Sequence, residues 1–136
     1  MKHLKILLLA SSLATLSGCA AYDAFNMAGY DNNEYLLATQ VRTAAELSTE
    51  ACEYREIIDR NLIHMNTLSL TLVNYTEHLP NNQEANDLAA KLHKLVTTTY
   101  DAYDSPDVSV GYCKAKMKLI EKNAASIQEA LGGKPQ

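Results

Sequence analysis

The sequence has few of the residues that interrupt or end helices. Its 136 residues include five glycines and three prolines, and tryptophan is absent. Neither glycine nor proline occurs between Glu34 and Leu79. Alanine, leucine, glutamate and lysine, which favour helices, are common. This composition predicts an all-α protein.

The motifs of several enzyme classes are also missing. The sequence contains no Gly-x-Ser-x-Gly, no His-Glu-x-x-His and no glycine-rich phosphate loop. It has no Glu-x-x-His pair either, so it does not support a di-iron bundle. The formal net charge is −4 and no basic patch is present, which argues against binding to nucleic acid. We therefore expect neither an enzyme nor a cofactor or metal.

One apolar run stands out, at the N-terminus. Lys2 and Lys5 precede apolar residues that extend from Ile6 to Leu16. A permanent membrane helix needs about 20 apolar residues, so this run is too short to be one. A positive start followed by a short apolar run is typical of a signal peptide, which we expect over residues 1–18. The sequence has no second apolar run long enough for a transmembrane helix.

The run ends in Leu16-Ser17-Gly18-Cys19, which resembles the lipobox of bacterial lipoproteins. The resemblance implies cleavage between Gly18 and Cys19 and a diacylglycerol on the Cys19 sulfur, which would anchor the chain in a lipid bilayer. Ala20 follows the cysteine and resembles the sorting signal for the outer membrane in lipoproteins of enteric type. The resemblance thus implies the periplasmic face of the outer membrane, with residues 19–32 as a lipidated N-terminus and linker. An ordinary signal peptide with an incidental cysteine is the alternative.

Two further cysteines, Cys52 and Cys113, form an even pair in the oxidising compartment that the signal peptide implies. Such a pair predicts one disulfide. The alternative is two separate buried thiols. Closing a loop of about 60 residues would stabilise the fold by about 4 kcal/mol in the chain-entropy model.

Apolar residues recur at helical spacing in three segments. We expect helices over residues 34–79, 83–103 and 106–131. The first follows the N-cap candidate Asp31 and is either one long helix or a helix kinked near Cys52. Ser105 is the expected N-cap of the last helix, with Pro106 at its first position, and Gly132-Gly133 is its expected end.

The segment lengths predict how the helices pack. The helix over residues 83–103 would be about 31 Å long, and folding it back from Pro80 places Cys113 beside Cys52. We therefore expect a disulfide-stapled three- to four-helix bundle over residues 33–131, with a long first helix and a C-terminal tail at 132–136. Residues 33–51 would extend as a stalk, bend back as a fourth helix, or bind another molecule. The oligomeric state stays open.

Tyrosines are the candidate interface residues. In the proposed packing, Tyr100 and Tyr103 lie one turn apart and near Tyr54 and Tyr112. Tyrosine is enriched at protein interfaces, but it also serves as a core residue with one polar edge. Both interpretations of these four residues stay open.

Three histidines support a rival hypothesis, in which the chain binds a metal or is an enzyme. His64, His78 and His93 would lie on facing helices, where two or three histidines can bind zinc. A metal-binding or enzymatic role would depend on them. We prefer the interpretation that they are solvated surface histidines.

The layout of the mature chain is similar to that of the pilotins of type II secretion. It has a lipobox, a helix ending at Cys52, a further helix, and then Asp104-Ser105-Pro106 and a cysteine that open the last helix. Pilotins are small, helical, disulfide-linked outer-membrane lipoproteins that bind a segment of the secretin in a helical groove. The run over residues 54–79 is longer than in that layout, and no groove residues carry over.

The lipid anchor, the missing catalytic motifs and the tyrosine-bearing helices predict a non-catalytic protein-binding module that engages another envelope protein. Pilotin-like escort is the most specific version of this hypothesis. An inhibitor, or an immunity or exclusion lipoprotein, is one alternative. A metal-binding or structural envelope protein is the other.

Intact mass of the protein extracted from membranes tests the anchor and the cysteine pair together. We expect a chain that begins at Cys19 and carries lipid, and a Cys52–Cys113 bond that reductant opens. An unlipidated chain with two free thiols would contradict both the signal-peptide and the disulfide predictions.

Overall fold

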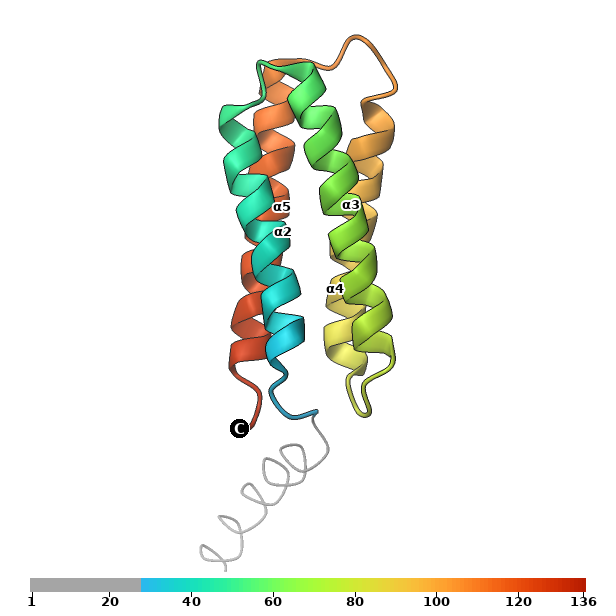
Figure 1. The fold of residues 1–136 in the computed structure, drawn as a ribbon, viewed down its shortest axis with the longest axis vertical. Coiled ribbons are helices and arrows are strands. Elements are labelled where there is room, and N and C mark those ends of the chain that lie inside the picture. Colours follow the sequence, from blue (N-terminus) through green and yellow to red (C-terminus); the bar gives the residue numbers. More distant parts are fainter. Residues whose placement is uncertain (1–27) are drawn as a thin grey trace, which may run out of the picture.

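Four helices make up most of residues 28–136, the part of the chain that the computed structural model describes (Figure 1). They are α2 (Asn32–Glu50), α3 (Arg55–Glu77), α4 (Gln83–Ala102) and α5 (Val110–Gly132). Each helix runs antiparallel to the one before it (Figure 1). Both α2 and α4 pack against α3 and α5, so the helices form an up-down-up-down bundle. The prediction of an all-α helical bundle is confirmed, whereas the signal peptide and lipobox lie outside the described residues.

The segment expected as one long or kinked helix is divided in two. Residues 51–54 form a turn between α2 and α3, so residues 33–51 bend back as a fourth helix, one of the three alternatives. No glycine or proline marks this break. Instead, buried Ser48 accepts a hydrogen bond from Asn61 at 2.9 Å, and Cys52 is held in a disulfide. Tertiary contacts therefore set the position of the turn.

The disulfide joins this turn to the first turn of α5. Cys52 and Cys113 are both buried, and their Cα atoms lie 5.8 Å apart. The predicted pairing is confirmed. It closes the end of the bundle at which α2 and α4 finish and α3 and α5 begin (Figure 1).

Side-chain caps define where α2 and α5 begin. Asp31, a predicted N-cap, accepts hydrogen bonds from the backbone N–H groups of Asn33 and Glu34 at 2.8 and 3.1 Å. The predicted start of the last helix at Pro106 is wrong. Ser109 caps α5 by accepting a hydrogen bond from the Tyr112 N–H at 3.1 Å, and the preceding residues remain in a loop.

The turn between α3 and α4 requires one unusual backbone conformation. Asn81 has a φ of 56°, in the left-handed region that asparagine tolerates better than most residues. The next residue, Asn82, is buried and turns its side chain toward the bundle. The Pro80-Asn81-Asn82 turn therefore also supplies a buried polar group.

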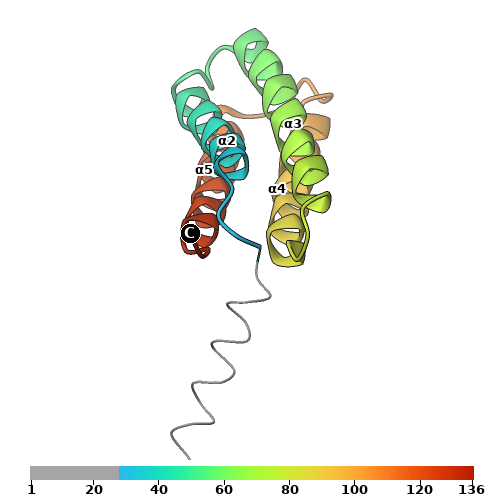
Figure 2. The same cartoon turned by 60° about the horizontal axis from the view of Figure 1, so that its bottom comes forward.

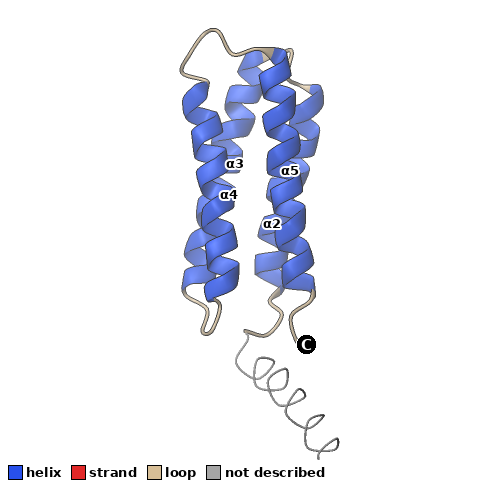
Figure 3. Cartoon of the chain, turned by 180° about the vertical axis from the view of Figure 1, so that it is seen from behind, coloured by secondary structure: helices blue, strands red, loops and turns tan. Residues whose placement is uncertain are grey.

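The core combines small and large side chains. The buried residues of α2 include Ala38, Val41 and Ala45, whereas α3 contributes the larger Ile58 and Leu62. Figure 2 shows α2 beside α5 and α3 beside α4, and Figure 3 shows the α4–α5 side from behind. None of the described helices is long and apolar enough to cross a membrane.

Removing the disulfide should destabilise the bundle. The bond spans a sequence separation of 61 residues, for which the chain-entropy model gives about 4 kcal/mol. We expect the C52A/C113A variant to lose about that much free energy of unfolding in urea titrations. Reductant should weaken the wild type and leave this variant unchanged. An unfolding midpoint equal to that of the oxidised wild type would contradict a stabilising role.

Candidate functional site

The exposed surface of α3 is uncharged over most of its length. No Asp, Glu, Lys or Arg occurs from Asn61 to Thr76. The outer face of a solvated helix normally carries charged residues. Here the exposed positions are apolar, hydroxyl-bearing, amide or imidazole side chains: Ile63, His64, Thr67, Leu70, Thr71 and Asn74.

The neighbouring surface of α2 continues this pattern. Leu36, Gln40, Thr43 and Leu47 are exposed and recur with spacings of four, three and four residues. Leu47 is 68% exposed, the highest value among the large apolar side chains described. The charged Arg42 turns away from α3 and donates a hydrogen bond to Gln128 of α5 at 3.2 Å.

A groove runs between the two helices, with a volume of about 440 Å³. Charged residues are absent from its lining, which consists of Thr39, Gln40, Thr43, Ala44, Leu47, Asn61, His64 and Leu68. Hydrogen bonds between α2 and α3 lie near its two ends. Asn33 donates to the Tyr75 hydroxyl at 3.0 Å, and Asn61 donates to Ser48 at 2.9 Å. We call the uncharged face this groove together with the exposed residues Leu36, Gln40, Thr43 and Leu47 of α2 and Ile63, His64, Thr67, Leu70, Thr71 and Asn74 of α3.

The opposite side of the bundle is formed by α4 and α5 (Figure 3), and these helices expose charged residues. The exposed charged residues of α4 and α5 are Glu84, Asp87, Lys91, Lys94, Asp101, Lys114, Lys118, Lys122 and Glu129. Charged side chains keep such a surface hydrated. The two sides of one small bundle therefore differ in the chemistry they present to a partner.

The candidate tyrosines gather at the disulfide end but differ in exposure. Tyr54 is 61% exposed, Tyr100 and Tyr112 are half-buried, and Tyr103 is buried. Arg55 lies over the Tyr103 ring, with 5.5 Å from its guanidinium carbon to the ring centre, and also donates to the Ser105 carbonyl at 2.9 Å. Burial raises the pKa of Tyr103, and the nearby arginine partly offsets this. Tyr103 is thus placed as a core residue, and an interface role for the others stays a prediction.

The three candidate histidines are not brought together. His64 borders the groove. His78, just after α3, hydrogen-bonds to the Asn74 carbonyl of α3 at 2.7 Å, and His93 hydrogen-bonds to Ser69 at 2.9 Å. Among residues 28–136, no group of three or more His, Cys, Asp or Glu side chains is placed to hold a metal ion.

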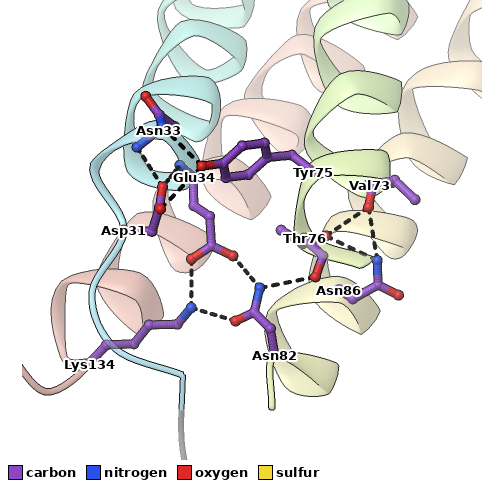
Figure 4. Close-up of polar contacts among 9 residues, drawn as sticks. All are labelled: Asp31, Asn33, Glu34, Val73, Tyr75, Thr76, Asn82, Asn86 and Lys134. Carbon is purple, nitrogen blue, oxygen red and sulfur yellow. Dashed lines mark hydrogen bonds and ion pairs between the residues drawn. The ribbon is translucent and has the colours of Figure 1, made fainter. Parts of the chain in front are cut away.

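A buried polar network closes the other end of the bundle (Figure 4). The Lys134 ammonium donates to Glu34 at 2.6 Å and to Asn82 at 2.5 Å, and Asn82 also donates to Glu34. Glu34 is fully buried, and Lys134 is 8% exposed. Asn82 donates further to the Thr76 carbonyl at 3.2 Å, so the network joins α2, α3, the α3–α4 turn and the C-terminal tail.

Sequence reasoning missed both the network and the uncharged face. Residues 132–136 were expected to be a tail, yet Lys134 is buried there, and nothing local in the sequence links it to Glu34. The uncharged face did have a local signal, the run without charge from Asn61 to Thr76. Cys19 lies outside the described residues.

Comparison of the chain with models of protein families, with curated proteins and with solved structures finds no match.

Removing the lysine of the buried pair should destabilise the bundle strongly. The K134A variant leaves the buried Glu34 carboxyl group without its cation, a change that typically costs about 3 kcal/mol or more. The exposed Lys118 provides a control, and K118A should change the free energy of unfolding by less than about 0.5 kcal/mol. Urea titration measures both. Equal stability of the two variants would contradict the role of the network.

Proposed function

We propose that this chain is a lipid-anchored, non-catalytic protein-binding module of the bacterial envelope, and that its uncharged face is the binding surface. The observation that carries the proposal is the exposure of Leu36, Leu47, Ile63 and Leu70 on a surface where α3 has no charged residue. Exposed apolar patches on soluble domains commonly mark interaction sites. The groove between α2 and α3 makes the centre of this surface concave.

The chemistry of the face suggests its partner. A groove lined by leucine, alanine, threonine, asparagine and glutamine suits an amphipathic helix that brings apolar side chains and few charges. Threonine and amide side chains at the rim would satisfy polar groups at the edges of such a helix. A strongly charged partner, such as nucleic acid, would gain nothing from this surface.

The anchor in this proposal is the lipobox cysteine, Cys19. The described chain begins at the end of the bundle away from the disulfide (Figure 1). Residues 19–28, fully extended, reach about 30 Å at roughly 3.3 Å per residue. A lipid on Cys19 would therefore hold the end with the Glu34–Lys134 pair near the bilayer and leave the length of the uncharged face accessible to other envelope proteins.

Pilotin-like escort is the most specific form of the proposal. It depends on the similarity in layout: a helix that ends just before Cys52, and Cys113 in the first turn of the last helix. The Asp104-Ser105-Pro106 segment lies in the loop before α5 rather than at its first turn. An inhibitor or immunity lipoprotein would use the same kind of surface against a different partner.

Photo-crosslinking in the producing bacterium tests the binding surface. A photoreactive amino acid in place of Leu47 should give a covalent adduct with a second envelope protein. The same amino acid in place of Lys94, exposed on α4, is the matched control and should give none. The adduct should diminish when Ile63 and Leu70 are changed to aspartate, since these changes place charge on the face.

Two outcomes would overturn the proposal. One is the absence of any adduct with another protein from position 47. The other is equal adduct formation from positions 47 and 94, which would mean that partners do not bind the uncharged face in preference to α4.

A further inference from the structure

We infer that the uncharged face packs against the same face of a second copy of this chain, in an antiparallel dimer that covers the binding surface until a partner displaces it. The observations that support the dimer do not depend on the proposed function. Only its consequence, occlusion of a partner, rests on the proposed function.

The first observation is that the exposed row on α2 has the same spacing in both directions and a leucine at each end. Leu36, Gln40, Thr43 and Leu47 are spaced by four, three and four residues, with leucine at both ends and polar residues between. A two-fold axis that crosses α2 midway along this row places Leu36 of one copy against Leu47 of the other. The same axis places Gln40 against Thr43, where an amide and a hydroxyl can hydrogen-bond. Such self-complementarity is what a two-fold symmetric interface requires.

The second observation is that the same axis crosses α3 at an exposed residue, Thr67. The Asn33–Tyr75 hydrogen bond marks a common level on the two helices. The midpoint of the α2 row lies about 13 Å above that level, at 1.5 Å per residue. Thr67, exposed on α3, lies about 12 Å above it. The axis therefore brings Thr67 of one copy close to Thr67 of the other.

The third observation concerns charge. Exposed glutamates cluster at the disulfide end of α2 and at the turn that follows it: Glu46, Glu50 and Glu53. A parallel dimer with α2 packed on α2 would bring these clusters together, and like charges repel. The antiparallel dimer instead places the glutamate clusters of the two copies at opposite ends of the interface.

The uncharged face is large enough for a specific dimer interface. A face two helices wide, at about 10 Å each, and about 28 Å long has a projected area of roughly 560 Å² per copy. Two such faces bury somewhat more than the total of about 1,000 Å² that a specific interface needs.

Charge substitutions on the purified full-length chain test the register as well as the dimer. Sedimentation equilibrium should give twice the mass of one chain for the wild type. L36E and L47K should each raise the dissociation constant of the dimer by roughly tenfold or more, since each places a charged side chain against a leucine of the other copy. The double variant L36E/L47K should restore it, because the introduced carboxylate of one copy then faces the introduced ammonium of the other. Circular dichroism confirms that each variant is folded.

An engineered cysteine gives a second readout that needs no weakened variant. T67C should form an intermolecular disulfide on oxidation with copper phenanthroline. T98C, an exposed threonine on α4, is the matched control and should stay monomeric on a non-reducing gel.

A monomeric wild type, a dimer unaffected by L36E and L47K, or a double variant weaker than either single variant would overturn the inference. These failures differ from failure of the proposed function. If the adduct from position 47 contains another protein and no second copy, the binding surface is right and the dimer is wrong. If it contains only a second copy, the dimer is supported and the partner is not.

Discussion

The Cys52–Cys113 bond holds the turn between α2 and α3 against the first turn of α5, and the arrangement of the bundle depends on this link. Without a fixed turn at residues 51–54, α2 and α3 could continue as one helix, because no glycine or proline separates them. With the turn fixed, α2 folds back beside both α3 and α5. The groove between α2 and α3 exists only in that arrangement.

The other end of the bundle is held by different chemistry. Lys134, Glu34 and Asn82 are all buried and satisfy one another's hydrogen-bonding groups, and the described residues contain no buried side-chain nitrogen or oxygen without a partner. A covalent link at one end and an ion pair at the other thus hold α2 in place at both ends. The small residues Ala38 and Ala45 let its inner side pack closely, while the exposed row from Leu36 to Leu47 lies beside α3. The stability of α2 and the presentation of the uncharged face are consequences of the same two contacts.

Sequence reasoning predicted the features that depend on local pattern or on cysteine count. Helical spacing and scarce glycine and proline were enough for an all-α bundle, and an even cysteine pair was enough for its disulfide. The division between α2 and α3 was not predictable as a definite turn, because tertiary contacts of Ser48 and Cys52 set it. The start of α5 was misplaced because Ser105 and Ser109 are equally good caps by residue type. Lys134 was missed because its partner Glu34 is distant in sequence and only the folded bundle brings them together.

The most direct test of the central claim, that the uncharged face is covered in the membrane, is hydroxyl-radical footprinting of leucines. The labelling of Leu36 and Leu47 is compared between the chain in its native membranes and the purified protein diluted until sedimentation shows a single chain. Leu119, 42% exposed on α5, provides the internal control. We expect Leu36 and Leu47 to be protected in membranes while Leu119 is labelled equally in both states. Equal labelling of all three leucines in both states would mean that nothing covers the face.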